Sequence, residues 1–166
     1  MSETEVHARD ESGTHARLED RVSVDVRDRV LKPVHDVFTA IVDPAKLSRF
    51  FISSASGPLK ARTMVEWAFA DVGARLSVDV KDIETDRKIV FEWTASGTKA
   101  LVTIALEARG SNATLVRITE DGWPLDRGGV TRALGQTAGW IDFICCMKAD
   151  LQHAINLRAG RTKEDH

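Results

Sequence analysis

The side chain best placed to do chemistry in this sequence is the carboxylate of Glu120. Alternate residues of a strand share a face, so Val116, Ile118 and Glu120 point the same way along an expected strand. An acid that follows two inward apolar positions needs a hydrogen-bond partner or a raised pKa, and an acid in that state suits proton transfer. The simpler interpretation ends the strand at Thr119 and leaves Glu120 solvated. Both alternatives stay open, and Asp121 is the neighbouring acid that would share a catalytic role.

The histidines form no recognisable catalytic or metal-binding set. His7, His15 and His166 lie near the chain ends, His35 opens an expected helix, and His153 falls on the outer side of another. No Ser-His-Asp arrangement, zinc-ligand spacing, phosphate loop or dinucleotide fingerprint is present. We therefore expect no metal and no cofactor. An enzyme is the less favoured hypothesis, because proton-transfer catalysis needs several converging polar groups.

The two cysteines, Cys145 and Cys146, are adjacent. Neighbouring side chains on a helix point about 100° apart, so a bridge between them would strain the backbone. Their spacing also suits no metal site. We expect one thiol to pack inward as a small hydrophobe and the other to flank it, and the alternative is a reactive thiol.

The last third of the chain predicts the helix that would position these groups. Residues from Asp126 to Leu157 read as one amphipathic helix, roughly 45 Å long at 1.5 Å per residue. Trp140 lies on a flank shared with Ala133 and Met147. Apolar or small residues recur in steps that keep one face toward a core. The residues expected on that inward face are Val130, Leu134, Thr137, Ile141, Ile144, Leu151 and Ile155.

Alternating apolar and polar residues before this helix predict an antiparallel sheet. The first strand covers Arg21–Leu31, and two short helices follow, one opening at Pro33 and one capped by Asp43. An edge strand near Leu59–Arg62 is an option. Short polar breaks between the later strands favour antiparallel neighbours. Those later strands are expected at Met64–Ala70, Arg75–Glu84, Lys88–Thr94, Leu101–Ala108 and Thr114–Asp121.

Large rings and branched side chains lie on the inward faces of these strands, and the long helix offers small residues to meet them. If the two sets interdigitate, they form a plain core. If they leave space, a cavity suited to an apolar or aromatic molecule results. The sequence leaves both alternatives open. The residues that would line such a cavity are Trp67, Phe69, Val78, Phe91, Trp93, Ile104, Ile118, Glu120, Trp140 and Ile144.

Composition narrows the class of protein. A chain of 166 residues that is 43% apolar and 29% charged predicts one globular domain. A net charge of −2 provides no basic field for nucleic acid, and no apolar run approaches the ~20 residues that span a bilayer. We expect no nucleic-acid partner, no stable membrane insertion, and a cytoplasmic location by default. The expected organisation is a flexible tail (1–20), one domain (21–160) and a C-terminal tail (161–166).

Several segments carry a family resemblance when they are taken in order. Residues 22–44 give a strand, a proline-led helix and Asp-Pro, and Phe50-Phe51 follow where many relatives have tryptophan. Residues 90–93 match a later strand, 114–123 the last strand and its exit, and 139–151 the final helix. Over residues 21–160 this set resembles the Bet v 1/START-like (SRPBCC) superfamily, and within it the domain related to the activator of Hsp90 ATPase.

The resemblance implies an α+β helix-grip fold, in which a curved antiparallel sheet wraps a long C-terminal helix around a cavity. It leaves the function open, because relatives include lipid and hormone binders, polyketide cyclases and co-chaperones. The favoured hypothesis is a carrier or sensor of a small apolar, aromatic or lipid-like ligand. The alternatives are an interaction module for an Hsp90-type chaperone and a polyketide cyclase-like enzyme. Exposed sheet edges also allow a homodimer.

Overall fold

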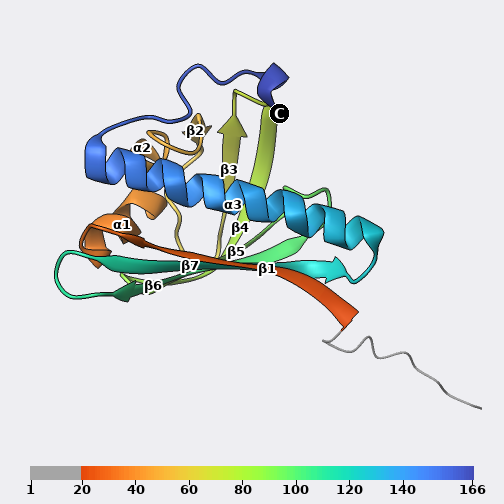
Figure 1. Ribbon diagram of the computed structural model, residues 1–166, viewed down its shortest axis with the longest axis horizontal. Coiled ribbons are helices and arrows are strands. Elements are labelled where there is room, and N and C mark those ends of the chain that lie inside the picture. The colour runs from red at the N-terminus through yellow and green to blue at the C-terminus, as the bar shows by residue number, and fades with distance from the viewer. Residues whose placement is uncertain (1–19) are drawn as a thin grey trace, which may run out of the picture.

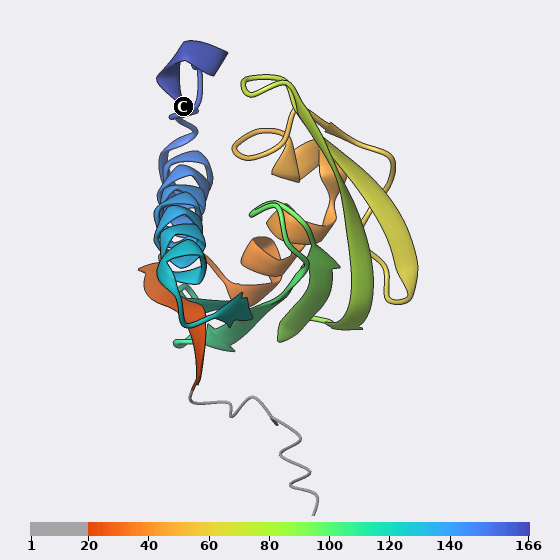
Figure 2. The same cartoon turned by 90° about the vertical axis from the view of Figure 1, so that its right-hand side faces the viewer.

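The computed structural model describes residues 20–166, so residues 1–19, which carry most of the predicted tail with His7 and His15, lie outside the described residues. In the described part, a seven-stranded antiparallel sheet curves around one long helix, α3 (Arg127–His153). Figure 1 shows α3 lying across the sheet, and Figure 2 shows it facing the concave side. This arrangement confirms the predicted helix-grip fold.

The strands lie in the order β1-β7-β6-β5-β4-β3-β2, with every neighbouring pair antiparallel. Short turns join β3 through β7, because consecutive antiparallel strands need no crossover helix. The first strand pairs with the last, so β1 forms one edge of the sheet beside β7. The bounds are β1 (Arg21–Val30), β2 (Ser54–Ala55), β3 (Thr63–Phe69), β4 (Ala74–Glu84), β5 (Lys88–Trp93), β6 (Ala100–Ala108) and β7 (Thr114–Pro124).

The optional edge strand at Leu59–Arg62 is not formed, and β2 takes the edge position beside β3. The side chain of Leu59 is buried, and its backbone N–H donates to the carbonyl of Val42 at 3.1 Å. Arg62 has a φ of 62°, a turn conformation that leads into β3. This segment therefore contacts the helical layer through Leu59, and Arg62 donates its backbone N–H to the carbonyl of Val80 in β4 at 2.8 Å.

The two predicted short helices are present as α1 (Val34–Val42) and α2 (Pro44–Leu47). A residue before proline avoids the helical conformation, and Asp43 is accordingly extended, with φ −86° and ψ 115°. Its carboxylate accepts the backbone N–H of Ala45 at 2.9 Å, which caps α2 as predicted.

Helix α3 has a capped start and a left-handed end. The carboxylate of Asp126 accepts the N–H of Gly129 at 2.8 Å. Glycine is required at this position, because a Cβ would lie 1.8 Å from the carbonyl oxygen of Pro124. The helix ends at His153, where Ala154 takes a φ of 55° and turns the chain back. The predicted continuation to Leu157 is therefore wrong.

The predicted inward face of α3 is also wrong. Val130, Leu134 and Ile141 are 37%, 67% and 44% exposed, and of the predicted set Ile144 alone is fully buried. The buried face is the flank that carries Trp140, and with it Phe143 and Met147. Apolar residues recur on both sides of this helix, so period alone could not choose between them. The side with the larger rings buries more apolar surface, so this side packs against the sheet.

The strand faces follow the predicted alternation. The apolar residues of β3, β5 and β6 that we expected to face inward are all buried in one core. Strand β7 continues through Glu120 to Pro124, so the interpretation that ends the strand at Thr119 is wrong. Glu120 is 0% exposed and must find its partners inside the protein.

The cysteines are placed as predicted, with Cys146 buried and Cys145 exposed on α3. Burial raises the pKa of the Cys146 thiol to about 11, and the nearby Asp142 carboxylate adds to the shift. At neutral pH Cys146 is therefore a protonated thiol that packs as a small apolar group.

Candidate functional site

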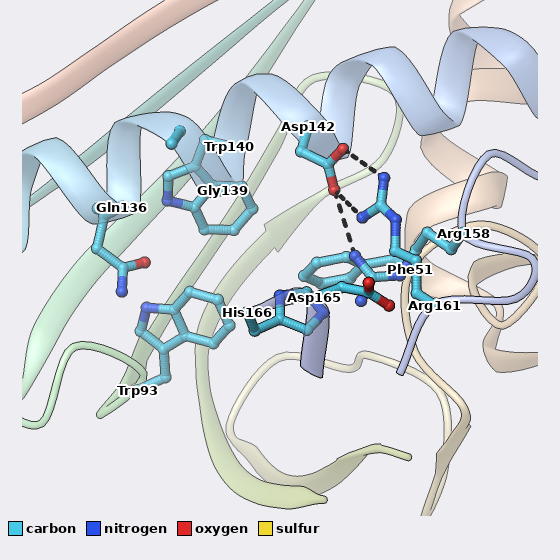
Figure 3. A pocket seen from close by; sticks show the side chains of 12 residues that line it. Phe51, Trp93, Gln136, Gly139, Trp140, Asp142, Arg158, Arg161, Asp165 and His166 are labelled. Atoms are coloured by element: carbon cyan, nitrogen blue, oxygen red, sulfur yellow. Dashed lines mark hydrogen bonds and ion pairs between the residues drawn. The ribbon is translucent and has the colours of Figure 1, made fainter. Parts of the chain in front are cut away.

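A pocket of about 480 Å³ lies against one flank of α3 (Figure 3), and we call it the helix pocket. On α3 this flank carries small residues, so the helix backbone itself forms part of the wall. A Cβ added at Gly135 or Gly139 would meet nothing within 4 Å. The residues that line the pocket are Phe51, Trp93, Gly135, Gln136, Ala138, Gly139, Trp140, Asp142, Arg158, Arg161, Asp165 and His166.

Three aromatic rings form the inner wall of the helix pocket. The rings of Trp93 and Trp140 lie with centroids 5.2 Å apart and planes 31° apart. Phe51 lies 6.3 Å from Trp140 and packs edge-on against Phe143 at 4.7 Å. Trp93 comes from the end of β5, Trp140 from α3, and Phe51 from the segment after α2. Three separate parts of the chain therefore supply one apolar surface.

Glu120 holds the two tryptophans of this wall from behind. Its Oε1 accepts the indole N–H of Trp93 at 2.7 Å, and its Oε2 accepts the indole N–H of Trp140 at 2.6 Å. With the amide of Gln136 oriented so that its nitrogen faces Glu120, that amide donates to Oε2 at 3.3 Å and accepts the N–H of Ser96 at 3.3 Å. We call Glu120, Trp93, Trp140 and Gln136 the carboxylate cage. It fixes both ring planes through hydrogen bonds whose loss would leave buried N–H groups unpaired.

Neutral groups alone donate hydrogen bonds to the Glu120 carboxylate within the carboxylate cage. Burial raises the pKa of Glu120 above its usual value, and the negative charge of Asp121 acts in the same direction. The hydrogen bonds from Trp140 and Trp93 oppose this shift by stabilising the ionised form. Glu120 is thus a buried acid with a perturbed pKa, placed behind the pocket wall and absent from the pocket lining.

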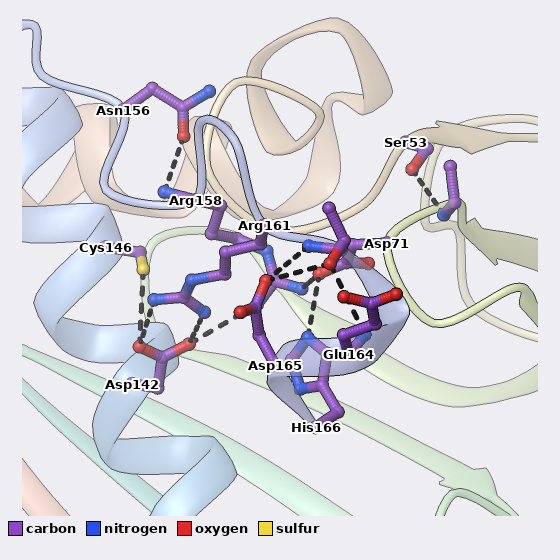
Figure 4. A network of polar contacts seen from close by, with 12 residues as sticks. Ser53, Asp71, Asp142, Cys146, Asn156, Arg158, Arg161, Glu164, Asp165 and His166 are labelled. Atoms are coloured by element: carbon purple, nitrogen blue, oxygen red, sulfur yellow. Dashed lines mark hydrogen bonds and ion pairs between the residues drawn. The ribbon is translucent and has the colours of Figure 1, made fainter.

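The outer wall of the helix pocket is the chain after α3, residues 154–166, which we call the C-terminal strap. Figure 1 shows it doubling back from the end of α3 toward the turn between β3 and β4. Arg161 makes two hydrogen bonds to Asp142 on α3, at 2.7 and 2.9 Å. Arg158 contacts Asp142 at 3.3 Å and also bonds to Asp71 in the β3–β4 turn (Figure 4). The strap therefore bridges the helix and the sheet with ion pairs.

The ten predicted cavity residues divide into three groups in the structure. Trp93 and Trp140 line the helix pocket, and Glu120 lies directly behind them. Of the small residues that α3 offers, Gly135, Ala138 and Gly139 line the pocket, whereas Ala133 is packed in the core. The other seven predicted residues are packed in the hydrophobic core, and their part in ligand binding stays a prediction: Trp67, Phe69, Val78, Phe91, Ile104, Ile118 and Ile144.

Sequence reasoning missed Phe51 as a pocket residue and missed the whole strap wall. Phe51 follows α2 in a turn, and nothing in its local sequence pattern points it toward α3. Arg158 and Arg161 lie in a polar segment, where basic residues are normally solvated. Their spacing of three residues is the one signal that hints at a shared partner.

Neither a cluster of metal ligands nor a helix able to span a membrane is present in the described residues. Within residues 20–166, no group of three or more His, Cys, Asp or Glu side chains is placed to hold a metal ion. In the same part of the chain, none of the helices has the length and apolar character needed to cross a membrane.

Comparisons with known proteins bear on the fold and the family of this chain. A search among curated proteins finds no match. Among solved structures, protein SSP2350 from Staphylococcus saprophyticus is 28% identical with a TM-score of 0.72, over 82% of this chain and 96% of that one. CalU16 from Micromonospora echinospora is 20% identical with a TM-score of 0.66, over 87% and 83%. The Aha1 dimer from Colwellia psychrerythraea is 16% identical with a TM-score of 0.68, over 80% and 97%.

The last two likenesses show the fold alone, and the family rests on the sequence itself. The sequence model of the family described as "Activator of Hsp90 ATPase homolog 1-like protein" matches residues 32–144, more than half of the chain. The match spans both short helices, the strands from β2 to β7, and the part of α3 that lines the helix pocket. This chain belongs to the family of activator of Hsp90 ATPase homolog 1-like proteins, within the predicted Bet v 1/START-like superfamily.

Proposed function

We propose that this protein binds a small, flat, largely apolar molecule in the helix pocket, as a carrier or sensor. The observation that carries the proposal is the pair of indole rings of Trp93 and Trp140, fixed side by side by Glu120 at the pocket wall. A rigid aromatic surface beside a strip of glycine and alanine on α3 suits an aromatic or polycyclic ligand. The pocket volume of about 480 Å³ falls in the range of small-molecule sites, roughly 300–1,000 Å³.

The charged side chains around the pocket are paired with one another, which favours a ligand with little net charge. Arg158 and Arg161 pair with Asp142 and Asp71, so two acids within the protein balance the two guanidinium charges. The acids at the rim are likewise engaged, since Asp165 accepts the backbone N–H of Thr162 at 2.6 Å. A charged ligand would have to displace these pairs, whereas an apolar one need not. Polar atoms at the rim can still orient a hydroxyl or carbonyl group.

The test fills the pocket without damaging the fold. Gly139→Leu places a branched side chain where nothing lies within 4 Å of the new Cβ. We expect it to weaken binding of the neutral fluorescent probe N-phenyl-1-naphthylamine by about tenfold or more, which corresponds to ~1.4 kcal/mol. Gly139→Ala is the matched control, because it makes the same change in helix propensity, worth about 1 kcal/mol of added stability, and leaves the pocket open.

Equal probe binding by the leucine and alanine variants would contradict the proposal. The natural ligand is sought in the freshly purified protein by native mass spectrometry, compared with the denatured mass. A retained small molecule in the wild type that is lost in Gly139→Leu would identify the ligand class by its mass. The same spectra test the predicted homodimer, which would appear at twice the chain mass.

A second candidate function is an interaction with an Hsp90-type chaperone, which the description of the family suggests. The observation that favours it is the exposed apolar face of α3, formed by Val130, Leu134 and Ile141. Exposed apolar patches of this kind are typical of protein contacts. Leu134→Glu should abolish stimulation of the chaperone ATPase if this face docks there, while probe binding in the helix pocket should be unchanged. Absence of any stimulation by the wild type would reject this candidate.

A further inference from the structure

The C-terminal strap lacks the apolar anchors that hold the rest of the domain. None of residues 154–166 is fully buried, and its larger apolar side chains, Ile155 and Leu157, are 52% and 48% exposed. Segments with few buried apolar contacts open at low free-energy cost, because little surface must be returned to water. What holds the strap in place must therefore be polar.

Two acids on separate elements supply those polar contacts (Figure 4). Asp142 on α3 bonds to both Arg158 and Arg161, and Asp71 in the β3–β4 turn bonds to Arg158 and lies 3.5 Å from the ring nitrogen of His166. The stem and ammonium of Lys163 lie over Gly73 in the same turn, within 2.6 Å of where a Cβ would be. We call these contacts the latch.

The latch and the helix pocket share side chains. Arg158, Arg161 and His166 line the pocket on one side and contact the latch acids on the other. Figure 3 shows His166 and Asp165 projecting between Trp93 and Asp142, in front of the aromatic wall. Breaking the latch would therefore remove one wall of the pocket and leave the carboxylate cage untouched.

We propose that the C-terminal strap is an ionically latched lid, and that its release from Asp71 and Asp142 controls the rate at which a ligand enters the helix pocket. This inference rests on the proposed function for its ligand, but the motion of the strap can be measured without one. Ion pairs between partly exposed side chains are weakened by salt, so the lid opens more often at high ionic strength. Entry of a neutral ligand should then become faster as salt rises.

The variant that tests the latch is Asp71→Asn, because Asp71 holds the strap without lining the pocket. Asp25→Asn is the control, since Asp25 also pairs with an arginine, Arg117, at 2.8 and 2.6 Å, but between strands β1 and β7 and away from the strap. We expect amide hydrogen exchange in residues 155–166 to rise about threefold to tenfold in Asp71→Asn and not in Asp25→Asn. Acrylamide quenching of tryptophan fluorescence should increase in the same variant.

Stopped-flow binding of N-phenyl-1-naphthylamine then links the strap to the pocket. Association should be faster in Asp71→Asn than in the wild type, and its salt dependence should be smaller. Unchanged exchange in residues 155–166 would overturn the latch, and faster exchange with unchanged quenching and association would overturn its role as a lid. If no variant binds the probe while exchange and quenching both rise, the lid stands and the proposed ligand class fails. Asp142→Asn, read by exchange and quenching alone, provides a second release of the same strap.

Discussion

The helix pocket has two walls, one held by buried hydrogen bonds and the other by ion pairs. In the inner wall, Trp93 and Trp140 donate to Glu120, which is 0% exposed. In the outer wall, Arg158 and Arg161 pair with acids while 17% and 25% of their side-chain surface stays exposed. A buried N–H that loses its partner costs about 1–3 kcal/mol, whereas a partly exposed ion pair contributes about 1 kcal/mol or less. One wall is therefore fixed in shape, and the other is adjustable.

The largest effect should come from removing a ring of the fixed wall. Trp140 is 2% exposed and packs against Trp93, Phe51 and Phe143. We expect Trp140→Ala to lower the free energy of unfolding by about 3–5 kcal/mol, the usual range for a buried aromatic truncation. Urea unfolding followed by circular dichroism measures this loss.

The control for this change lies on the opposite side of the same helix. Leu134 is 67% exposed, so Leu134→Ala should alter stability by about 0.5 kcal/mol or less. A loss below ~1 kcal/mol for Trp140→Ala would show that its ring is loosely packed around the pocket, and the fixed wall would then be as adjustable as the strap.

The next largest effect should come from the acceptor of the carboxylate cage. In Glu120→Gln, the amide oxygen can accept one indole N–H, but the amide nitrogen then faces the other indole, donor against donor. We expect a loss of about 1–3 kcal/mol of stability for the one buried N–H left unpaired. The measurement is again urea unfolding, at a pH near 7.

A double-mutant cycle separates this hydrogen-bond effect from general damage. In a Trp93→Phe background, one indole N–H, that of Trp140, is left to be accepted. The stability lost on Glu120→Gln should therefore be smaller. Strictly additive costs would mean that Glu120 does not couple the two rings, and the description of the inner wall as one unit would have to be abandoned.

The fold could be predicted because its signals are local. Alternation marked the strands, and Asp43-Pro44 marked the break and cap between α1 and α2. The choice of face on α3 could not be made from periodicity, because apolar residues such as Leu134 and Ile141 recur on the side that faces solvent. That choice depends on how well the facing sheet accommodates Trp140, a property of the folded packing.

The site was only partly predictable because its contacts are distant in sequence. Alternation left open whether Glu120 points inward or is solvated. Its burial is tolerable only because Trp93 and Trp140 donate to it, and these come from two other elements. The spacing of Arg158 and Arg161 could not identify their partners, since Arg158 contacts Asp71 only when the chain doubles back over the domain. Long-range polar pairing of this kind has no sequence period to reveal it.

The smallest expected effect is the pH dependence of the stability that each wall contributes, and it separates the two walls most sharply. Burial raises the pKa of Glu120 above 4.5, so its contribution to stability is full below that pH and is lost as pH rises through the folded pKa. Hydrogen bonds from Arg161 hold the pKa of Asp142 below 3.8, so its contribution is present above that pH and is lost as pH falls through the folded pKa. The two walls should therefore lose stability at opposite ends of the pH range.

Urea unfolding from about pH 3 to pH 8 separates the two contributions. Glu120→Gln should remove the decline on the alkaline side of 4.5 and keep the acid decline, while Asp142→Asn should do the reverse with an amplitude below ~1 kcal/mol, because its pair is partly exposed. Amide exchange in residues 155–166 should respond to Asp142→Asn and stay unchanged in Glu120→Gln, because the strap opens without unfolding the core. If both variants flatten the same end of the profile, the two walls share one electrostatic unit, and a fixed surface facing an adjustable lid is the wrong description of this pocket.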